Sequence, residues 1–478
     1  MKQKRRKKPN DRWPGHAPAT EEKTKKTKGT RRTSGAPAGL LPRNGSGKVS
    51  RVAPTRLTSS AVATTARPRR APVQRDDAPR ALYVVCAPGL EGITNGELRA
   101  LGVQTGDVEP GGVTLDGNAD IIYRTNLHLR SASRVLARVA EFRVTTFYDL
   151  EARARHIEWE RWLGAEPVRV RVTCRKSKLY HSDAVAQRFV QAMSKRTGAW
   201  AASRDARNAG ELDEGADPKG DGDGASGVEG GGGGEGEDAQ LFIVRLLHDT
   251  CTVSVDTSGA LLHRRGYRQA VAKAPLRETI AASMVLASGW RGEAPLVDPL
   301  CGAGTIPIEG ALLARRIAPG ITRGFAFMRW PSFDAAAWAR HLAEARKQEL
   351  PNAPAPIVGT DRDTGAVEAA MANATRAGVA ADVELSQRSL SELQPPDAPG
   401  WLITNPPYGV RVGAADTVRD LYAQLGNVAR GALPGWGIGF LSPDRSLDTQ
   451  PRIAVTPAFE TTNGGIKVRY LTGRISGA

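Results

Sequence analysis

Short apolar runs that end in glycine, proline or a polar residue recur through the second half of the 478-residue chain. The run 296–298 is followed by a turn with Gly302 and Gly304, and then by apolar or small residues at helical spacing from Ile306 towards Gly320. Further strands are predicted over 356–361, 383–385, 401–403, 438–442 and 466–471, and further helices over 366–377 and 421–429. Because strands and helices alternate, this half predicts an α/β fold built on a parallel sheet.

The first half of the chain predicts two smaller α+β units. In residues 81–149 the predicted strands are 82–86, 113–115 and 139–144, and the predicted helices end at Leu101 and Leu127. Residues 150–258 form the second unit, in which 168–172 alternates strictly between apolar and polar residues and therefore predicts a half-buried strand. A loop at 175–181, a helix to Thr197 and a strand at 241–247 complete it.

The net charge of +17 is concentrated at one end of the chain. Residues 1–80 carry 22 Lys and Arg against 5 Asp and Glu, whereas the rest of the chain carries 45 of each. This basic tail lacks periodic apolar residues and is predicted to be disordered; phosphate binding and simple solubilisation remain equal alternatives for it. Residues 204–238 are rich in glycine and acidic side chains and are predicted to form a flexible insertion.

The four cysteines, the seven histidines and the apolar stretches exclude several classes of protein. The cysteines lie far apart without a CxxC pair, and the histidines form no ligand cluster with them, so neither a metal site nor a disulfide framework is expected. No apolar stretch has the length of a membrane span, and the N-terminus lacks the apolar core of a signal peptide. We expect a cytoplasmic protein without a membrane partner.

The segment Asn405–Pro406–Pro407–Tyr408 offers the most specific candidate chemistry. It ends a predicted buried strand, because proline cannot donate a hydrogen bond to a sheet. It presents an amide oxygen, carbonyls of fixed direction and an aromatic ring, a set that suits holding a flat base by its amino group. Taken alone, the tripeptide Asn-Pro-Pro is more typical of an ordinary proline turn after a strand. The glycine turn at 302–304 is neither a phosphate loop nor a good match to GxGxxG, but it lets the backbone pass close to a ligand, and Asp361 at the next strand end offers an acceptor for ribose hydroxyls.

Three motifs in combination resemble a known enzyme family. Residues 298–309 (DPLCGAGTIPIE), 359–361 (GTD) and 405–411 (NPPYGVR) are similar to those of the THUMP-domain RNA guanine-N2 methyltransferases, above all the bacterial large-subunit ribosomal RNA enzymes. The segments 256–259 and 263–268 are similar to the family's junction between its RNA-binding and catalytic parts. The resemblance covers about residues 81–478.

This resemblance implies a fold and a domain order. We expect a Rossmann-like class I methyltransferase domain at 259–478, which depends on S-adenosylmethionine and ends in an antiparallel hairpin. A ferredoxin-like module at 81–149 and a THUMP RNA-binding module at 150–258 would precede it.

The resemblance also implies site residues. Asp361 would hold the ribose of the cofactor, Gly302 and Gly304 would admit its methionine end together with Thr305, and Asp298 would orient the glycine turn or the amino group. Asn405 and the Pro406 carbonyl would accept the two amine hydrogens of guanine, Pro407 would fix the backbone and Tyr408 would stack on the base. The expected RNA contacts are Lys176, Lys178, Tyr180, Arg265 and Arg268. Ser389 stands near the position where such enzymes place an acidic residue towards the adenine.

Several interpretations remain open on the sequence. Ribosomal RNA is the preferred substrate, and transfer RNA is the nearest alternative. An adenine-N6 DNA methyltransferase and a non-catalytic ribosome-assembly factor are two others. Arg130 and Arg134 suit structural ion pairs as well as RNA contacts. The sequence does not predict the oligomeric state.

Overall fold

The computed structural model describes residues 79–164, 166–201, 239–269, 276–409 and 415–476. The predicted insertion at 204–238 and nearly all of the predicted basic tail lie outside these ranges, as do residues 410–411 of the last family motif.

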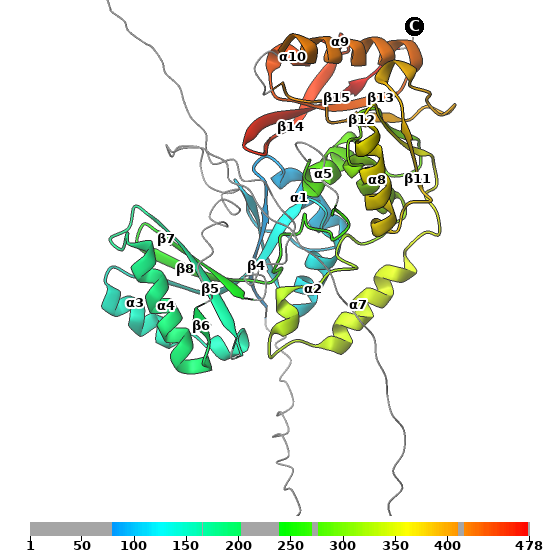
Figure 1. The fold of residues 1–478 in the computed structure, drawn as a ribbon. Coiled ribbons are helices and arrows are strands. Elements are labelled where there is room, and N and C mark those ends of the chain that lie inside the picture. The colour runs from blue at the N-terminus through cyan, green and yellow to red at the C-terminus, as the bar shows by residue number, and fades with distance from the viewer. Residues whose placement is uncertain (1–78, 165, 202–238, 270–275, 410–414, 477–478) are drawn as a thin grey trace, which may run out of the picture. The chain divides into compact units, whose positions relative to one another are not determined.

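Eight strands of the first half form one sheet in the order β2-β3-β1-β4-β8-β7-β5-β6 (Figure 1). Alternate residues of β1, among them Leu82 and Val84, are buried, as the apolar pattern predicts. The strands are β1 (Arg80–Cys86), β2 (Val108–Glu109), β3 (Gly112–Gly117), β4 (Ala132–Arg143), β5 (Pro167–Arg175), β6 (Trp200–Ala201), β7 (Gln240–Leu247) and β8 (Thr250–Asp256).

Strand β4 joins the two predicted α+β units into a single sheet. It pairs antiparallel with β1 on one side and with β8 on the other. The predicted strand 139–144 is only the second half of β4, and the apolar pattern does not predict β8 as a strand. Because strand partners more than a hundred residues apart leave no local signal, the pattern indicates most of the strands but not this pairing.

Four α-helices lie among the described residues of this first half. Two of them begin at side-chain caps: Asn118 accepts from the Ile121 amide at 3.3 Å, and Thr146 accepts from the Asp149 amide at 3.1 Å. Helix α4 ends at Gly198, whose φ of +74° is the left-handed conformation that suits glycine. The helices are α1 (Glu91–Ala100), α2 (Ala119–His128), α3 (Phe147–Arg155) and α4 (Ser182–Thr197), with a short 3-10 helix η1 (Trp159–Arg161).

Seven strands of the second half form a sheet in the order β11-β10-β9-β12-β13-β15-β14. The first five run parallel, and β15 is antiparallel to both β13 and β14. This confirms the Rossmann-like α/β fold and its closing hairpin. The strands are β9 (Leu296–Asp298), β10 (Ile357–Asp361), β11 (Val383–Gln387), β12 (Trp401–Thr404), β13 (Gly437–Ser442), β14 (Val455–Asn463) and β15 (Ile466–Arg474).

The direction of these strands places the carboxyl ends of the five parallel strands and of β14 at one edge of the sheet. Strands β9, β10 and β12 end at Asp298, Asp361 and Thr404. From β9, the chain first adds β10 and β11 on one side and then β12 and β13 on the other, so the strand order reverses at β9. Such a reversal of strand order is where open parallel sheets bind ligands. Strand β14 runs in the same direction, because it pairs antiparallel with β15, so its last residue, Asn463, ends towards the same edge.

The helices of the second half are α5 (Glu278–Ser288), α6 (Thr305–Ala314), α7 (Ala335–Lys347), α8 (Thr364–Ala377), α9 (Ala415–Ala432) and α10 (Arg445–Asp448), with 3-10 helices η4 (Ala326–Arg329) and η5 (Leu390–Glu392). Helix α6 ends at Ala314, earlier than the predicted end near Gly320. Arg316 takes a left-handed φ of +57° there, and the Ile317 amide donates to the Leu312 carbonyl at 2.9 Å. A non-glycine residue in this conformation gives no sequence signal for a helix end.

Residues between α6 and β10 complete the hydrophobic core of the first sheet. Phe327 lies 4.8 Å from Tyr123 between ring centroids, and Trp330 lies 4.8 Å from Trp162 in an edge-to-face pair. These side chains and Trp338 are buried in the same cluster as Leu82 and Val84. The segment 325–345 therefore packs with the first half of the chain, although it follows β9 in sequence.

No helix within the described ranges is both long and apolar enough to cross a membrane. Among the same residues, no group of three or more His, Cys, Asp or Glu side chains could hold a metal ion. All four cysteines are free thiols.

Candidate active site

The loop between β9 and α6 is held by hydrogen bonds from several sides. The Cys301 amide donates to the Thr360 carbonyl at 2.9 Å, and the Asn373 side chain donates to the Ala303 carbonyl at 3.0 Å. Gly304 has a φ of +81°, and a Cβ there would lie 2.9 Å from the Ala370 side chain, so only glycine fits. Gly302 also has a positive φ, but a Cβ on it would meet no atom within 4 Å. The loop thus presents bare backbone at Gly302 to open space.

Asp361 lies against this loop. Its Oδ2 accepts from the Gly302 amide at 2.9 Å, and its Oδ1 accepts from the Asp363 amide at 3.0 Å. Each carboxylate oxygen has a second lone pair, so acceptor capacity remains for hydroxyl groups of a ligand. Asp363 in turn caps α8 by accepting from the Gly365 amide at 2.9 Å.

Asp298 connects the glycine loop to β12 by hydrogen bonds. It is buried, and its Oδ1 accepts from the Thr404 hydroxyl at 2.6 Å and from the Leu300 amide at 3.1 Å. Burial, with Asp361 nearby, raises the pKa of Asp298 to about 7. Of the two predicted roles, the orientation of the glycine turn agrees with these contacts. The residue before Asn405 is therefore fixed to the same carboxyl group as the glycine loop.

Asn405 follows directly on Thr404 and is half-buried. Its Oδ1 accepts from the Tyr408 hydroxyl at 2.8 Å, and the same hydroxyl accepts from Nδ2 of Asn463 at 3.1 Å. Pro406 is buried and Pro407 is exposed. The Tyr408 ring packs partly on the core that includes Phe459, and burial raises the pKa of Tyr408 to about 12, so its hydroxyl is protonated at neutral pH.

Thr305 and the two predicted RNA-contacting arginines lie inside the protein. The Thr305 hydroxyl accepts from Arg268 at 3.0 Å, and Arg268 pairs with Glu278 at 3.2 Å. Arg265 is only 4% exposed; it pairs with Glu309 at 3.4 Å and donates to the Arg130 carbonyl at 2.6 Å.

The placement of Arg265 contradicts its predicted RNA contact, because a buried guanidinium that is paired and hydrogen-bonded cannot reach a phosphate. Arg268 is largely buried and pairs with Glu278, so we do not retain it as an RNA contact. The arginines of this junction instead supply donors to carbonyl and carboxylate groups of the interior.

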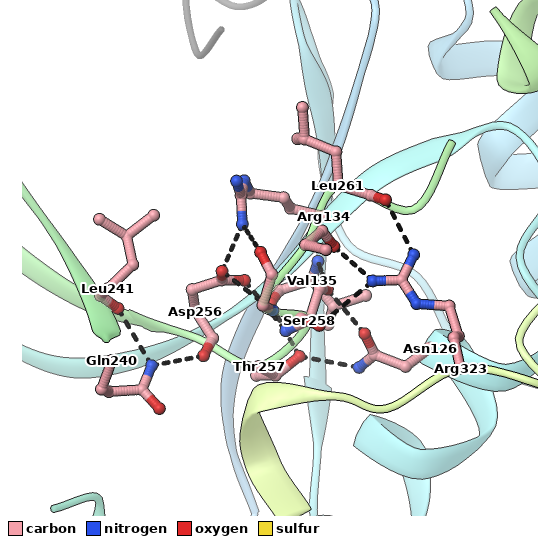
Figure 2. A network of polar contacts seen from close by, with 12 residues as sticks. Asn126, Arg134, Val135, Gln240, Leu241, Asp256, Thr257, Ser258, Leu261 and Arg323 are labelled. Atoms are coloured by element: carbon pink, nitrogen blue, oxygen red, sulfur yellow. Dashed lines mark hydrogen bonds and ion pairs between the residues drawn. The ribbon is translucent and has the colours of Figure 1, made fainter. Parts of the chain in front are cut away.

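A buried polar network lies beside this junction (Figure 2). Arg134 forms an ion pair with Asp256, and Arg323 donates to the Leu261 carbonyl at 2.8 Å. Asn126 donates to the Thr257 hydroxyl at 2.8 Å and accepts from the Ser258 hydroxyl at 2.6 Å. Of the two alternatives for Arg134, the structural ion pair is the one observed. Arg130 likewise donates to the Ile317 carbonyl at 2.6 Å.

The other three predicted RNA contacts lie on the surface. Lys176, Lys178 and Tyr180 are exposed in the loop between β5 and α4, and the Tyr180 side chain is 70% exposed. The loop is held by Asp249, whose Oδ1 accepts from the Lys178 amide at 2.7 Å. The strand register places Arg175 beside Leu247, Leu247 beside Thr250 and Thr250 beside Arg143, so the loops after β4, β5 and β7 emerge at one end of the sheet.

Sequence reasoning missed three residues around these sites. Tyr148, at the start of α3, is 83% exposed and follows one of the loops that emerge beside Tyr180. Asn373 holds the glycine loop, whereas the sequence pattern indicates only a small residue of a helix there. The pattern at Asn463 indicates only a turn. Ser389, at the position where the resemblance leads one to expect an acidic residue, caps η5 together with Glu392.

The comparisons with known proteins agree with this geometry. The family description "RMKL-like, methyltransferase domain" matches residues 265–471, and "RlmL ferredoxin-like domain" matches residues 81–136. The Synechocystis protein slr0064, which carries the provisional name RNA methyltransferase, is 31% identical over 82% of this chain and 96% of its own length. The ribosomal RNA large subunit methyltransferase K/L of Syntrophotalea carbinolica is 34% identical over 83% of this chain, which spans 53% of that protein.

Solved structures show the same fold. SMU.472, a methyltransferase candidate complexed with SAH, has a TM-score of 0.69 and 29% identity over 84% of this chain and 98% of its own. A Listeria monocytogenes protein described as a predicted N6-adenine-specific DNA methylase has a TM-score of 0.68 and 32% identity over 82% of this chain and 96% of its own. These findings confirm the methyltransferase and ferredoxin-like parts of the predicted resemblance. The chain belongs to the family of proteins with the RMKL-like methyltransferase domain.

Proposed function

We propose that this chain transfers a methyl group from S-adenosylmethionine to the exocyclic N2 amine of a guanosine in 23S ribosomal RNA. The observation that carries the proposal is the position of Asn405: its amide follows the strand end that Asp298 ties to the glycine loop. An acceptor for an amine and an open backbone loop therefore meet at the ligand edge of one parallel sheet.

The glycine loop and Asp361 fit the cofactor. The open space at Gly302 admits a group close to the backbone, and the remaining lone pairs of Asp361 suit the two ribose hydroxyls. Asp298 and Asn373 would hold the loop in place without touching the cofactor. When bound, S-adenosylmethionine supplies an electrophilic methyl group, and SAH in the solved relative SMU.472 supports this class of cofactor.

The nucleophile needs orientation more than a base. The lone pair of a guanine amine is delocalised into the ring, so the amine reacts only when it is held in line with the methyl group. The Oδ1 of Asn405 would accept one amine hydrogen, and the Pro406 carbonyl would accept the other. As the N–CH3 bond forms, the S–CH3 bond would break and S-adenosylhomocysteine would leave. The amine proton becomes acidic during this step and would pass to water, so no strong base is needed before transfer. The ring of Tyr408 would contact the base face.

We place RNA binding on the surface formed by Lys176, Lys178 and Tyr180, within the region expected to be a THUMP module. Lysine ammonium groups neutralise phosphates, and an exposed tyrosine offers a ring on which an unpaired base stacks. Tyr148 is added to this surface, because the register of the sheet brings its loop to the same end. We call these four residues the Lys-Tyr surface.

Two relatives bear on the choice of substrate. The name of the Syntrophotalea carbinolica protein favours ribosomal RNA of the large subunit, although this chain spans only about half of that protein. The name of the Listeria monocytogenes protein favours adenine-N6 methylation of DNA as a second candidate. Both reactions use an Asn-Pro-Pro-Tyr site, so only the product separates them.

The first experiment identifies the product. The purified full chain is incubated with S-adenosylmethionine labelled in its methyl group and with unmodified ribosomal RNA, transfer RNA or DNA, and each is digested to nucleosides. N2-methylguanosine from ribosomal RNA is expected. The same nucleoside only from transfer RNA would change the substrate, and N6-methyldeoxyadenosine would establish the second candidate. No label in any acceptor would contradict methyl transfer to nucleic acid.

A substitution at Asn405 then tests the site. Asn405→Ala removes the acceptor for the amine and should lower kcat at least about 100-fold, as expected for loss of one preorganised polar contact in the transition state. The dissociation constant for the cofactor should change less than about twofold, because Asn405 does not touch the glycine loop. Asn352→Ala, at an exposed asparagine that precedes the start of β10, whereas Asp361 ends that strand, is the control. A fully active Asn405→Ala variant would overturn the assignment.

A further inference from the structure

Asn463 contacts the active site although its strand, β14, is the last in the strand order of the sheet. It is the last residue of β14, before a turn in which Gly464 and Gly465 have φ values of +57° and +80°. Although its hairpin lies at the outer side of the sheet, the direction of β14 brings its end towards the edge that carries Asn405. Its side chain is buried, at 5% exposure, and its Nδ2 lies 3.1 Å from the Tyr408 hydroxyl.

The hydrogen bonds through Tyr408 have a fixed direction. A tyrosine hydroxyl carries one proton, and it accepts here from Nδ2 of Asn463. Its own proton therefore goes to the Oδ1 of Asn405 at 2.8 Å. Burial keeps the hydroxyl protonated, whereas the bond from Asn463 acts in the other direction on its pKa. The two hydrogen bonds therefore run in one direction: Asn463 donates to Tyr408, and Tyr408 donates to Asn405.

A role in the turn alone does not account for Asn463. Asparagine stabilises turns when its Oδ1 accepts from a backbone amide nearby. In Asn463 that atom is buried and has no hydrogen-bond partner among the described residues. A buried unpaired acceptor costs about 1–3 kcal/mol. An apolar residue would avoid this cost, and the hydrogen bond that the amide makes at its other end is the one to Tyr408.

We propose that Asn463 is a positioning residue that, through the Tyr408 hydroxyl, keeps the oxygen of the Asn405 amide available to the substrate amine. This inference rests on the proposed function. An amide flipped about its last bond would present its NH₂ group to the substrate NH₂ group, and the two donors would repel. The Tyr408 proton binds one lone pair of Oδ1, opposes the flip and leaves the second lone pair for the amine. Tyr408 thus acts through its hydroxyl as well as its ring.

The first test removes these hydrogen bonds. Tyr408→Phe keeps the ring and removes the hydroxyl, and Asn463→Ala removes the donor behind it. Each variant should lower kcat about tenfold, which corresponds to about 1.4 kcal/mol. The KM for RNA and the dissociation constant for the cofactor should stay within about twofold. Because both act on the same link, the double variant should be little worse than either single variant.

A matched control separates positioning from simple stabilisation. The hydroxyl of Tyr422 is also buried, but it donates to the Leu441 carbonyl at 2.9 Å and not to a residue of the active site. Tyr422→Phe should lower the melting temperature and leave kcat of the folded protein unchanged. If Asn463→Ala behaves like Tyr422→Phe, with a lower melting temperature and an unchanged kcat, then Asn463 is structural and the proposal is wrong.

The second test uses pH to reverse the direction of the hydrogen bond between residue 463 and the Tyr408 hydroxyl. In Asn463→Asp, a protonated carboxyl can donate to the Tyr408 hydroxyl, whereas an ionised carboxylate can only accept its proton and would withdraw it from Asn405. The activity of the variant relative to the unsubstituted protein should therefore fall as pH rises through the pKa of the new carboxyl, which burial raises. The pKa of Tyr408 is about 12 and burial raises that of Tyr422 further, so neither titrates in this range.

The outcomes distinguish this inference from the proposed function. If the unsubstituted protein methylates no RNA, the proposed function fails. If it is active and the relative activity of Asn463→Asp does not depend on pH, the positioning role fails while the enzyme assignment stands. Asn352→Asp, which places a carboxyl at an exposed position, controls for a general effect of the added charge.

Discussion

Two short segments of this chain contain similar types of residue but differ in how deeply they are buried. Residues 175–181 (RKSKLYH) and 263–268 (HRRGYR) each combine basic residues with a histidine and a tyrosine. In the first segment the Tyr180 side chain is 70% exposed; in the second, Tyr267 is 4% exposed and donates to Glu309 at 3.0 Å. Burial, with the neighbouring arginines, lowers the pKa of His263 to about 3, so this histidine is neutral at pH 7.

The difference lies in what the surrounding backbone requires. The segment 263–268 crosses a buried junction, where carbonyl groups need donors; Arg265 supplies them to Leu262 and Arg130 at 2.6 Å each. The segment 175–181 leaves the end of a sheet, where Asp249 and Ser177 pair with its backbone and the lysines are exposed. Arginine suits the buried segment because its guanidinium group offers five hydrogen-bond donors, and lysine suits the exposed segment. A basic motif therefore indicates nucleic-acid binding only where the fold leaves it outside.

The largest expected effect comes from the buried segment. Arg265→Ala leaves Glu309 uncompensated in the interior and should destabilise the protein by about 3–5 kcal/mol, measured by thermal denaturation. Arg264→Ala, next to it but exposed, should change stability by less than about 0.5 kcal/mol. If Arg265→Ala kept its stability but bound RNA more weakly, Arg265 would be an RNA contact and the comparison would be wrong.

An intermediate effect is expected at the exposed tyrosine. Tyr180→Ala should weaken binding of single-stranded RNA by about 1–3 kcal/mol, the usual loss for one stacked base, without a change in melting temperature. Tyr180→Phe keeps the ring and should bind as the unsubstituted protein does. Titration of a fluorescent oligoribonucleotide measures both, and equal loss in the two variants would argue against stacking.

The smallest effect is expected from the lysines of the Lys-Tyr surface. Lys176→Ala with Lys178→Ala should reduce the slope of log affinity against log salt concentration by about 1.4, about 0.7 for each phosphate contact on a single strand. Binding curves at several salt concentrations give this slope. An unchanged slope would mean that neither lysine contacts a phosphate, so that Tyr180 would bind RNA without these two basic neighbours.

The parallel half of the fold could be predicted because its signals are local. The strand ends at Asp298 and Asp361, the glycine turn and the Asn-Pro-Pro-Tyr segment each lie within a few residues, and the carboxyl ends of parallel strands meet by geometry. The burial of Arg265 could not be predicted, because it depends on carbonyl groups far away in the sequence. The contact of Asn463 with Tyr408 also depends on the register of a hairpin at the far side of the sheet.

The pairing of β4 with β8 affects how the protein is made. The outer edge of β4, residues 132–143, finds its partner only when residues 250–256 have been synthesised, and Phe327 and Trp338 join the same core later still. At about 5–20 residues per second, this is a delay of several seconds or more. The N-terminal module therefore emerges from the ribosome with an open strand edge, which is a target for aggregation and for chaperones, and it should not fold as a fragment that ends before Asp256.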